Sequence, residues 1–325
     1  MTEYIRKLLS LINQDIRSID LEGQPIELYE PIRYILDLGG KRMRPILALL
    51  SYGLYKNDIE KIISIVTGIE VFHNFTLMHD DIMDEAPLRR GQATVHKKWN
   101  EEIGILSGDV MLVKAYERLE QVEAEKIYRV LQRFNTCAAE VCEGQQLDMN
   151  FENLEKVTEA EYLEMIRLKT AVLLGFSMEL GAILADAPEN HQQLLKDFGV
   201  NIGLGFQLKD DLLDVYGEQS KFGKQVGGDI ISNKKTYLLI TALQEASGDL
   251  EWELKKWLTK TGFVKWEKVN AITAIYNQLG IKERTEKKMD QYFYNANQAL
   301  DRLGIETDRL SELKAFTYYL THRDR

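Results

Sequence analysis

Cysteine and proline are both scarce in this chain of 325 residues. The two cysteines, Cys137 and Cys142, are five positions apart in a stretch of helical periodicity, where side chains at that spacing do not face each other well. The sequence therefore predicts no disulfide framework and favours a reducing cytoplasm. With only 5 prolines and 45% hydrophobic residues, the chain has little material for linkers and ample material for a core.

An excess of positive charge is also missing. Asp and Glu number 51 against 41 Lys and Arg, which gives a formal net charge of −10. A general nucleic-acid binder needs basic residues to neutralise the phosphate backbone, so we expect no nucleic-acid partner. An acidic protein can still bind an anionic ligand through a metal ion, because the metal supplies the missing positive charge.

Long apolar runs are absent as well. The best candidate, Ala171–Ala185, is too short for a membrane span and is interrupted by Glu179, so it is interpreted as a buried helix. The first ten residues carry three charged side chains and lack the apolar core of a signal peptide. We expect a cytoplasmic protein with no membrane span.

Helical periodicity dominates the sequence, and alternating strand patterns are scarce. A capping box is predicted at Thr158 and Glu161, and left-handed helix ends are predicted at Gly280 and Gly304. The fold class is therefore all-α, in a single domain over residues 1–325. The predicted helices cover roughly 2–19, 25–37, 41–55, 58–84, 103–121, 124–149, 159–185, 190–216, 234–247, 262–279, 282–302 and 306–321.

Two of these helices, Ile62–Leu77 and Phe198–Leu213, are apolar around their whole circumference, which predicts that other helices surround them. Each ends in Asp-Asp-x-x-Asp: Asp80, Asp81 and Asp84 in the first, and Asp210, Asp211 and Asp214 in the second.

Aspartates four positions apart project from one helix face and repel each other unless a cation lies between them. Such oxygen ligands suit magnesium, which completes its shell with water and substrate phosphate. One copy could be only a solvated acidic helix end. Two copies after apolar helices favour metal ions that hold one diphosphate from both sides and make it a good leaving group.

Two basic segments accompany the aspartates. Gly39–Pro45 places Lys41, Arg42 and Arg44 beside a helix start, where backbone N–H groups also attract anions. Arg89 and Arg90 directly follow the first aspartate cluster. Basic residues at helix ends are often only solvated, so each segment alone is a weak signal.

Together these motifs resemble the trans-isoprenyl diphosphate synthase family over roughly residues 35 to 240. They occur in the family's order: Gly-Gly-Lys-Arg-x-Arg-Pro, His-Asp-Asp-x-x-Asp with Arg-Arg-Gly after it, Lys-Thr, Gly-Phe-Gln-x-x-Asp-Asp-x-x-Asp and a lysine-bearing loop. The resemblance implies a single helical bundle of the isoprenoid synthase type with a deep central cavity. It also implies head-to-tail condensation of isopentenyl diphosphate with an allylic diphosphate.

The resemblance assigns roles by position. Residues implied to hold isopentenyl diphosphate are Lys41, Arg44, His73 and Arg90. Residues implied to bind the allylic diphosphate are Arg89, Lys169, Thr170, Gln207, Lys224 and Lys234. The six aspartates with Lys169 and Lys224 form the implied catalytic set, and the implied metal ligands are Asp80, Asp84 and Asp210.

The family mechanism implies that metal ions and cationic side chains draw the diphosphate from the allylic substrate. The double bond of isopentenyl diphosphate attacks the resulting carbocation, which an apolar, aromatic-rich cavity shelters from water. A proton is then lost to the released diphosphate. The implied cofactor is Mg²⁺, three ions per active site, with Mn²⁺ as a substitute. The implied partners are isoprenoid diphosphates and a second copy of the chain.

Other interpretations compete. Glu70-x-x-His73 matches half of a di-iron carboxylate site, but a second copy is missing. A satisfied core histidine is the remaining alternative for His73. His79 either orients the aspartates or packs. A class I terpene cyclase would carry a different second metal motif and would not need cations for a second diphosphate. A catalytically silent regulatory subunit is the remaining alternative, although inactive relatives usually lose one aspartate cluster.

Product length should depend on the residues before Asp80. In the family, the residues four and five positions earlier form the cavity floor, and here they are Thr76 and Phe75. At the helical rise, Phe75 lies about 7.5 Å and Phe72 about 12 Å below Asp80. The aromatic side chain at the nearer level resembles enzymes that make C15 or C20 products, and a longer-chain polyprenyl diphosphate synthase is the alternative.

Overall fold

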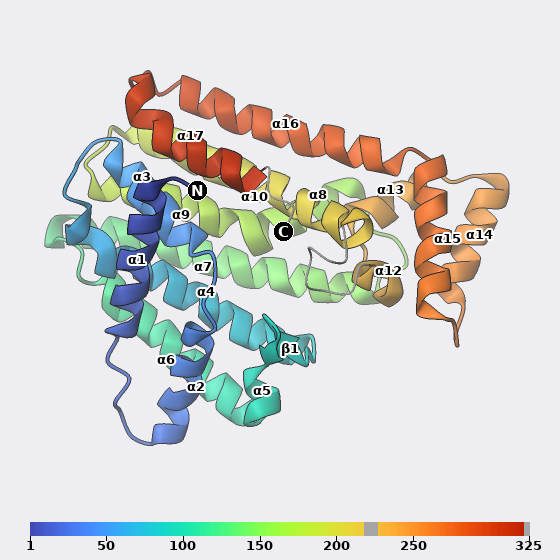
Figure 1. The fold of residues 1–325 in the computed structure, drawn as a ribbon, viewed down its shortest axis with the longest axis horizontal. Helices are drawn as coiled ribbons and strands as arrows, with labels where there is room; N and C mark the ends of the chain where they lie inside the picture. Colours follow the sequence, from blue (N-terminus) through green and yellow to red (C-terminus); the bar gives the residue numbers. More distant parts are fainter. Residues whose placement is uncertain (218–226, 322–325) are drawn as a thin grey trace. The chain divides into compact units, whose positions relative to one another are not determined.

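The computed structural model describes residues 1–217 and 227–321 (Figure 1). Over these residues the chain is helical, apart from connecting segments and one antiparallel hairpin of two short strands, β1 (Leu88–Arg89) and β2 (Gln92–Ala93). The prediction of an all-α fold is confirmed.

The chain divides into two compact units, and each is described by itself. The first unit comprises Met1–Thr136, Phe176–Lys196 and Leu303–Thr317, and the second comprises Cys137–Gly175, Asp197–Arg302 and the C-terminal residues from Tyr318. Four helices each contain a boundary between these units along the chain: α7 (Ala124–Asn153), α9 (Val172–Leu184), α10 (Glu189–Tyr216) and α17 (Thr307–Thr321). The first aspartate cluster belongs to the first unit and the second cluster to the second.

The first unit is built around α4, whose apolar residues are mostly buried and which packs against α1, α2, α3 and α6. Its elements are α1 (Glu3–Arg17), α2 (Ile26–Asp37), α3 (Met43–Gly53), the 3-10 helix η1 (Ile59–Ile62), α4 (Ile63–Met83), β1, β2, α5 (Val95–Lys98), α6 (Glu101–Leu119) and parts of α7 (Ala124–Asn153), α9 (Val172–Leu184), α10 (Glu189–Tyr216) and α17 (Thr307–Thr321).

By length and composition, the segment Ile59–Met83 could cross a membrane, although 61% of its most apolar window is buried inside the protein. Core helices of globular proteins pass the same test. Its burial confirms the prediction that other helices surround Ile62–Leu77.

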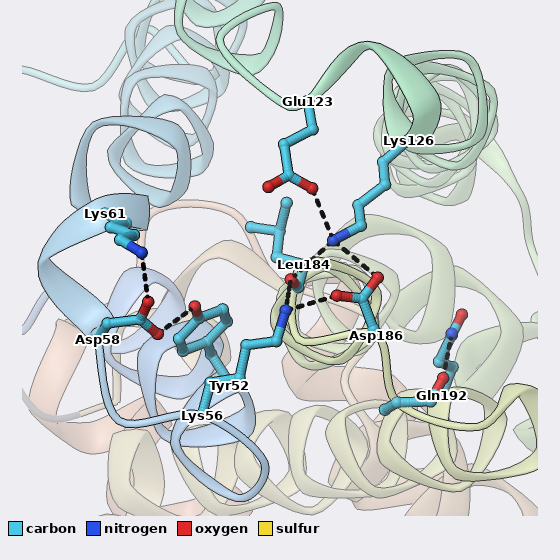
Figure 2. A network of polar contacts seen from close by, with 10 residues as sticks. Tyr52, Lys56, Asp58, Lys61, Glu123, Lys126, Leu184, Asp186 and Gln192 are labelled. Carbon is cyan, nitrogen blue, oxygen red and sulfur yellow. Dashed lines mark hydrogen bonds and ion pairs between the residues drawn. The ribbon is translucent and has the colours of Figure 1, made fainter.

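A polar network closes the end of α9 in the first unit (Figure 2). The last carbonyls of a helix have no partner within it. Lys126 Nζ donates to the carbonyl of Leu184 at 3.2 Å, and Lys56 Nζ lies 3.5 Å from the same oxygen. Both ammonium groups also pair with Asp186, at 2.8 and 2.5 Å. Two lysines from α7 and the segment after α3 therefore cap the helix.

The second unit contains two apolar clusters. One joins the end of α10 to the helices between residues 228 and 301, and the other joins α7 to residues 157–171, 204–208 and 237–240. Buried residues of the predicted apolar helix Phe198–Leu213 contribute to both. The remaining elements are α8 (Glu159–Ile166), the π-helix η2 (Arg167–Ala171), α12 (Gly228–Ser232), α13 (Tyr237–Glu245), α14 (Gly248–Thr259), α15 (Lys265–Gln278) and α16 (Ile281–Asp301).

The capping box of Thr158 and Glu161 is confirmed, as are the left-handed conformations of Gly280 and Gly304, at φ 65° and 64°. The continuous helix predicted over 159–185 is wrong, because the π-helix Arg167–Ala171 interrupts it. Helix α14 was not predicted, because Leu254 is its one buried residue and the remaining pattern is largely charged. The four-residue helix α5, the five-residue helix α12 and the two-residue strands were not predicted either, because segments this short show no recognisable periodicity.

Candidate active site

The first aspartate cluster lies at the end of α4. Asp80 and Asp81 are on the last turn, and Asp84 is the C-cap. The amide of Asp84 donates to the carbonyl of Asp80 at 2.8 Å, so helical geometry continues through the motif. Negative side chains are unfavourable beside the unsatisfied carbonyls of a helix C-terminus. The cluster therefore requires positive charge beside it.

Arg89 supplies part of that charge. Its Nε and Nη2 each lie 2.7 Å from a different oxygen of Asp81, and Nη2 is 3.8 Å from Asp80. The side chain of Asp81 is only 3% exposed. The middle aspartate of the motif is thus fixed by the protein, while Asp80 is partly exposed and Asp84 exposed.

The hairpin explains how Arg89 reaches the aspartates. Arg90 and Gly91 form its turn with φ values of 53° and 77°, and two positive φ angles in a two-residue loop match the twist of a hairpin. A left-handed arginine is a strained backbone position, of the kind that concentrates at functional sites. From this turn, Arg90 Nη1 donates to the carbonyl of Gly39.

Arg42 was not among the predicted site residues. It is the N-cap of α3, has φ 47° and is buried. Its guanidinium donates to Glu70 Oε1 at 2.9 Å, to the carbonyl of Leu36 at 2.7 Å and to Asn13 Oδ1 at 3.1 Å. Because Arg42 turns inward, it anchors the chain between its two neighbouring cations. No sequence signal separates the three cations of this segment.

The contact with Arg42 also explains why a glutamate occupies position 70. Its carboxylate accepts from buried Arg42, and it lies 3.4 Å from Asn74 Nδ2. The Glu-x-x-His pattern is therefore explained by an ion pair within the core, without a di-iron site.

His73 is half-buried on α4, one turn after Glu70. Burial, followed by the charges of Arg44 and Arg90 and of two further arginines, holds the pKa of its imidazole well below the usual value. A neutral imidazole can donate one hydrogen bond without adding charge. Arg44 and Arg90 therefore lie near enough to His73 for their charges to act on its imidazole. Their role in binding isopentenyl diphosphate stays a prediction.

The predicted chain-length residues lie in an aromatic cluster of the first unit. The ring centroid of Phe72 is 5.6 Å from that of Phe75 and 5.0 Å from that of Phe134 on α7. Phe72 is 1% exposed, and Phe75 is half-buried. Thr76 donates its hydroxyl to the carbonyl of His73 at 2.8 Å. Phe134 and its neighbour Phe176 extend this cluster beyond α4, which sequence reasoning missed.

His79 packs away from the aspartates. Its Nε2 lies 3.1 Å from the carbonyl of Ile105 on α6, and its ring is 4.8 Å from that of Phe75. A Cβ added at Gly108 would be 2.2 Å from Nε2, so this glycine makes room for the ring. The packing interpretation of His79 is confirmed.

The second cluster lies near the end of α10. As in the first cluster, its middle aspartate is fixed by other protein groups while the other two are more exposed. Asp211 is buried and accepts the hydroxyl of Tyr162, Nε2 of Gln207 at 3.3 Å and the amide of Tyr237 at 3.4 Å. Burial, followed by the charge of Asp229, raises the pKa of Asp211 to about 7. Asp210 and Asp214 are partly exposed.

Two of the predicted allylic-diphosphate residues, Lys169 and Lys234, converge on Asp148, which sequence reasoning missed. Lys169 Nζ lies 2.7 Å from Asp148 Oδ2, and Lys234 Nζ is 3.7 Å from the same oxygen. Although burial by itself would raise the pKa of Asp148, the two lysines hold it below the usual value. A single aspartate in the middle of a helix carries no motif signal.

The π-helix places the Lys-Thr motif. Lys169 and Thr170 lie within Arg167–Ala171, and a Cβ at Gly144 of α7 would be 2.1 Å from the Lys169 amide nitrogen, so the two backbones touch. Thr170 donates to Gln207 Oε1 at 3.3 Å, and Gln207 in turn bonds Asp211. Short π segments inside helices often occur at functional sites. Lys224 lies outside the described residues.

The donor set fits a hard divalent cation. In the part of the chain described, no three His, Cys, Asp or Glu side chains converge as a ready-made metal cage. Magnesium does not need one, because it binds through one or two carboxylates plus water and phosphate. Asp80 and Asp210, which are partly exposed, and Asp84, which is exposed, can offer such oxygens. Asp81 and Asp211 are instead held by the protein.

Two aspartate clusters at helix ends, together with arginines in one unit and lysines in the other, are typical of α-helical enzymes that act on diphosphates. Comparison with known proteins places the chain within that class. The Polyprenyl synthetase family profile matches residues 25–279, and the chain belongs to this family.

Relatives cover most of the chain. It is 42% identical over 246 residues to a short chain isoprenyl diphosphate synthase of Methanocaldococcus jannaschii, with 75% of this chain and 74% of that protein covered. It is 34% identical over 317 residues to a geranylgeranyl diphosphate synthase of Saccharolobus solfataricus, with 94% and 90% covered. A crystal structure of a geranylgeranyl pyrophosphate synthase matches with a TM-score of 0.93 and 41% identity, and 99% of each chain is covered.

Proposed function

We propose that the protein is a magnesium-dependent prenyltransferase that condenses isopentenyl diphosphate with an allylic diphosphate, giving a short-chain all-trans prenyl diphosphate. The allylic substrate is dimethylallyl, geranyl or farnesyl diphosphate. The observation that carries this proposal is that each aspartate motif has one carboxylate bound by other protein groups and neighbouring carboxylates that are accessible. Asp81 and Asp211 are anchored by Arg89 and Tyr162, and partly exposed carboxylates remain on either side.

The cationic sets account for two substrates. Arg44 and Arg90, with neutral His73, would hold the diphosphate of isopentenyl diphosphate and orient its double bond. Lys169 and Lys234, now paired with Asp148, would turn to the allylic diphosphate and stabilise the charge that develops as it leaves. The apolar, aromatic surroundings of Phe72 and Phe75 exclude water from the carbocation.

Magnesium, when bound by Asp80, Asp84 and Asp210, would neutralise charge on the departing diphosphate. The released diphosphate takes the proton lost in the final step, and no protein side chain forms a covalent bond with substrate. In this proposal both aspartate clusters serve one leaving group, and residues 1–325 act as a single catalytic domain.

The proposal is tested by Asp80→Ala and Asp210→Ala, with Asp290→Ala on the exposed face of α16 as the matched control. Each of the first two variants should lower kcat by at least about 100-fold, because charge in the transition state loses its counter-ion. The control should retain the wild-type rate. Turnover of both substrates is followed by chromatography against prenyl standards, and chelation of divalent metal should stop it. A near-normal rate in either aspartate variant would remove that cluster from the mechanism.

The same assay separates the competing functions. Chain extension supports the synthase, a cyclic hydrocarbon would indicate a terpene cyclase, and no product would favour a regulatory subunit. The relatives described above, a short chain isoprenyl diphosphate synthase and a geranylgeranyl diphosphate synthase, support a C15 or C20 product over a longer polyprenyl chain.

We also propose that the enzyme acts in the cytoplasm as a homodimer. Ile105, Leu106 and Val113 on α6 are 45%, 57% and 56% exposed. Large exposed apolar patches mark interaction sites on globular proteins. An apolar groove between the start of α2 and α6, lined by Leu28, Leu106 and Val113 among others, continues the patch, which supports a second copy as its partner.

A further inference from the structure

Lys268 on α15 is a buried lysine outside all the motifs. Its residue exposure is 0%. Nζ donates to Asn233 Oδ1 at 2.6 Å and to the carbonyl of Ile231 at 3.2 Å, and it lies 4.3 Å from the ring centroid of Phe263. None of these three partners carries a negative charge. A buried ammonium group is costly unless its donors are satisfied, so these acceptors determine where Lys268 and the segment it contacts lie.

The segment held by Lys268 is the turn that ends α12. Asn233 is the C-cap of this helix and has φ 57°, a left-handed conformation that asparagine tolerates. Its amide Nδ2 donates to the carbonyl of Leu258 near the end of α14, at 3.0 Å. One side chain is therefore held by two helices of the C-terminal region, α14 and α15, of which α15 lies beside α12 (Figure 1).

The other end of α12 is tied to the second aspartate cluster. Gly227 donates its amide to the carbonyl of Asp214 at 2.6 Å, and the amide of Asp229 donates to Asp214 Oδ2 at 2.9 Å. A Cβ at Gly227 would be 2.6 Å from Val269, the residue after Lys268. Consecutive residues of α15 thus contact both ends of a helix that is too short to be stable alone.

Lys234 follows Asn233 directly. Its amide donates to the carbonyl of Asp229 at 2.9 Å, and its Nζ lies 3.7 Å from Asp148, beside Lys169. The backbone conformation of Asn233 therefore sets the direction in which Lys234 leaves the turn.

We propose that Lys268 is a positioning residue for Lys234, and that the C-terminal helices α14 and α15 thereby control binding of the allylic diphosphate. The inference rests on the proposed function, in which Lys234 binds that diphosphate. Lys268 does not touch the substrate itself. It fixes the turn at Asn233 through two hydrogen bonds, and the turn aims the neighbouring ammonium group.

The test is Lys268→Met, which keeps the length and apolar stem of the side chain and removes its donors. KM for the allylic diphosphate should rise about tenfold, the effect of losing one to two hydrogen bonds, while KM for isopentenyl diphosphate stays within about twofold. Lys265→Met, an exposed position on the same helix, is the matched control and should change neither constant. An equal rise in both constants would indicate a general structural role and overturn the proposal.

A double-mutant cycle with Lys234→Ala then asks whether the two lysines act through one contact. If Lys268 works through Lys234, adding Lys268→Met to Lys234→Ala should raise the allylic KM no further, because coupled residues are not additive. Multiplying effects would contradict the inference. Asn233→Gly serves if Lys268→Met does not fold. Glycine keeps the left-handed conformation and loses the amide links, so the allylic KM should again rise selectively.

Amide hydrogen exchange separates this inference from the proposed function. The Lys234 amide should exchange at least about tenfold faster in Lys268→Met, because its turn opens more readily. Unchanged exchange would overturn the positioning role. If Lys234→Ala leaves the allylic KM at its wild-type value, the assigned role of Lys234 is wrong, and faster exchange in Lys268→Met would still show that Lys268 holds the turn.

Discussion

Within each aspartate motif, the three carboxylates have different surroundings. Both carboxylate oxygens of Asp81 accept hydrogen bonds from Arg89, and buried Asp211 accepts a hydrogen bond from the Tyr162 hydroxyl. The flanking aspartates of each motif are less buried. The anchored carboxylate fixes the rotation of the last helical turn, so its neighbours face a fixed direction. Asp80, Asp84 and Asp210 remain our predicted metal ligands.

Product length is expected to depend on Phe75, which packs against buried Phe72. In Phe75→Ala the product should lengthen by one or more isoprene units, because the aromatic obstacle nearest to Asp80 is removed. Phe75→Tyr, which keeps the ring, is the control and should retain the wild-type distribution. Chromatography against prenyl standards measures the result. An unchanged distribution in Phe75→Ala would place the floor on another helix, with Phe134 as the next candidate.

The neutral state of His73 should be visible in stability. Burial and the surrounding arginines lower the pKa of its imidazole in the folded protein, so the unfolded chain takes up a proton at a higher pH than the folded one. Stability from this group is present above the unfolded pKa of about 6.5 and is lost as the pH falls below it. Relative to His73→Gln, the wild type should lose up to about 1.4 kcal/mol per pH unit between pH 6.5 and 5. Urea unfolding across this range measures the difference. Parallel curves would show that His73 is protonated in the folded protein.

At the scale of elements, the site depends on short irregular structures between long helices. The hairpin turn at Arg90, the left-handed N-cap at Arg42 and the π-helix Arg167–Ala171 each direct a cationic side chain. Each departs from regular geometry, and packing from a different helix holds it in place. The long helices provide the buried surroundings that stabilise these irregular conformations.

The ion pair between Arg42 and Glu70 joins the start of α3 to α4, with side chains 2% and 3% exposed. Removing one partner leaves a buried unpaired charge, so Arg42→Met or Glu70→Leu should each lower the free energy of unfolding by about 3–5 kcal/mol. The double variant should recover most of that loss, because no charge is left uncompensated. Urea unfolding gives the three values.

The control for this cycle is Glu251→Gln, which breaks an ion pair with Lys255 whose side chains are 43% and 63% exposed. That change should leave the free energy of unfolding nearly unchanged, because solvent screens an exposed ion pair. A double variant of Arg42 and Glu70 that is destabilised by the sum of its single changes would show that the two side chains are not energetically coupled.

At the scale of the whole molecule, sequence-distant segments complete each compact unit. The first unit includes Leu303–Thr317 from the far end of the chain, where Arg309 donates to the carbonyl of Leu54 at 3.0 Å. In the second unit, the region after Gly248 supports the turn before Lys234 through Lys268. The C-terminal helices, which carry no motif, therefore contribute to both units.

Assembly is tested at this scale by Leu106→Glu combined with Val113→Glu. If the exposed face of α6 is covered by a second copy, two buried carboxylates should convert the dimer to a monomer at micromolar concentration. Light scattering coupled to gel filtration measures the mass, and circular dichroism confirms retained helicity. Glu117→Gln, an exposed change farther along the same helix, is the control. A double variant that remains dimeric would place the interface on another surface.

The sequence alone was sufficient for the all-α class, for the helices that carry the motifs and for the candidate residues of both aspartate clusters. Apolar spacing along a helix and the chemistry of Asp-Asp-x-x-Asp are local properties, so they can be read without knowing what lies opposite. The tertiary structure decided which aspartate of each motif is anchored and why Arg42 differs from Arg44. It also decided that Asp148 pairs with Lys169 and Lys234, and that Lys268 holds the turn before Lys234. These features depend on partners far apart along the chain, and burial gives a charge its role only once those partners are in contact.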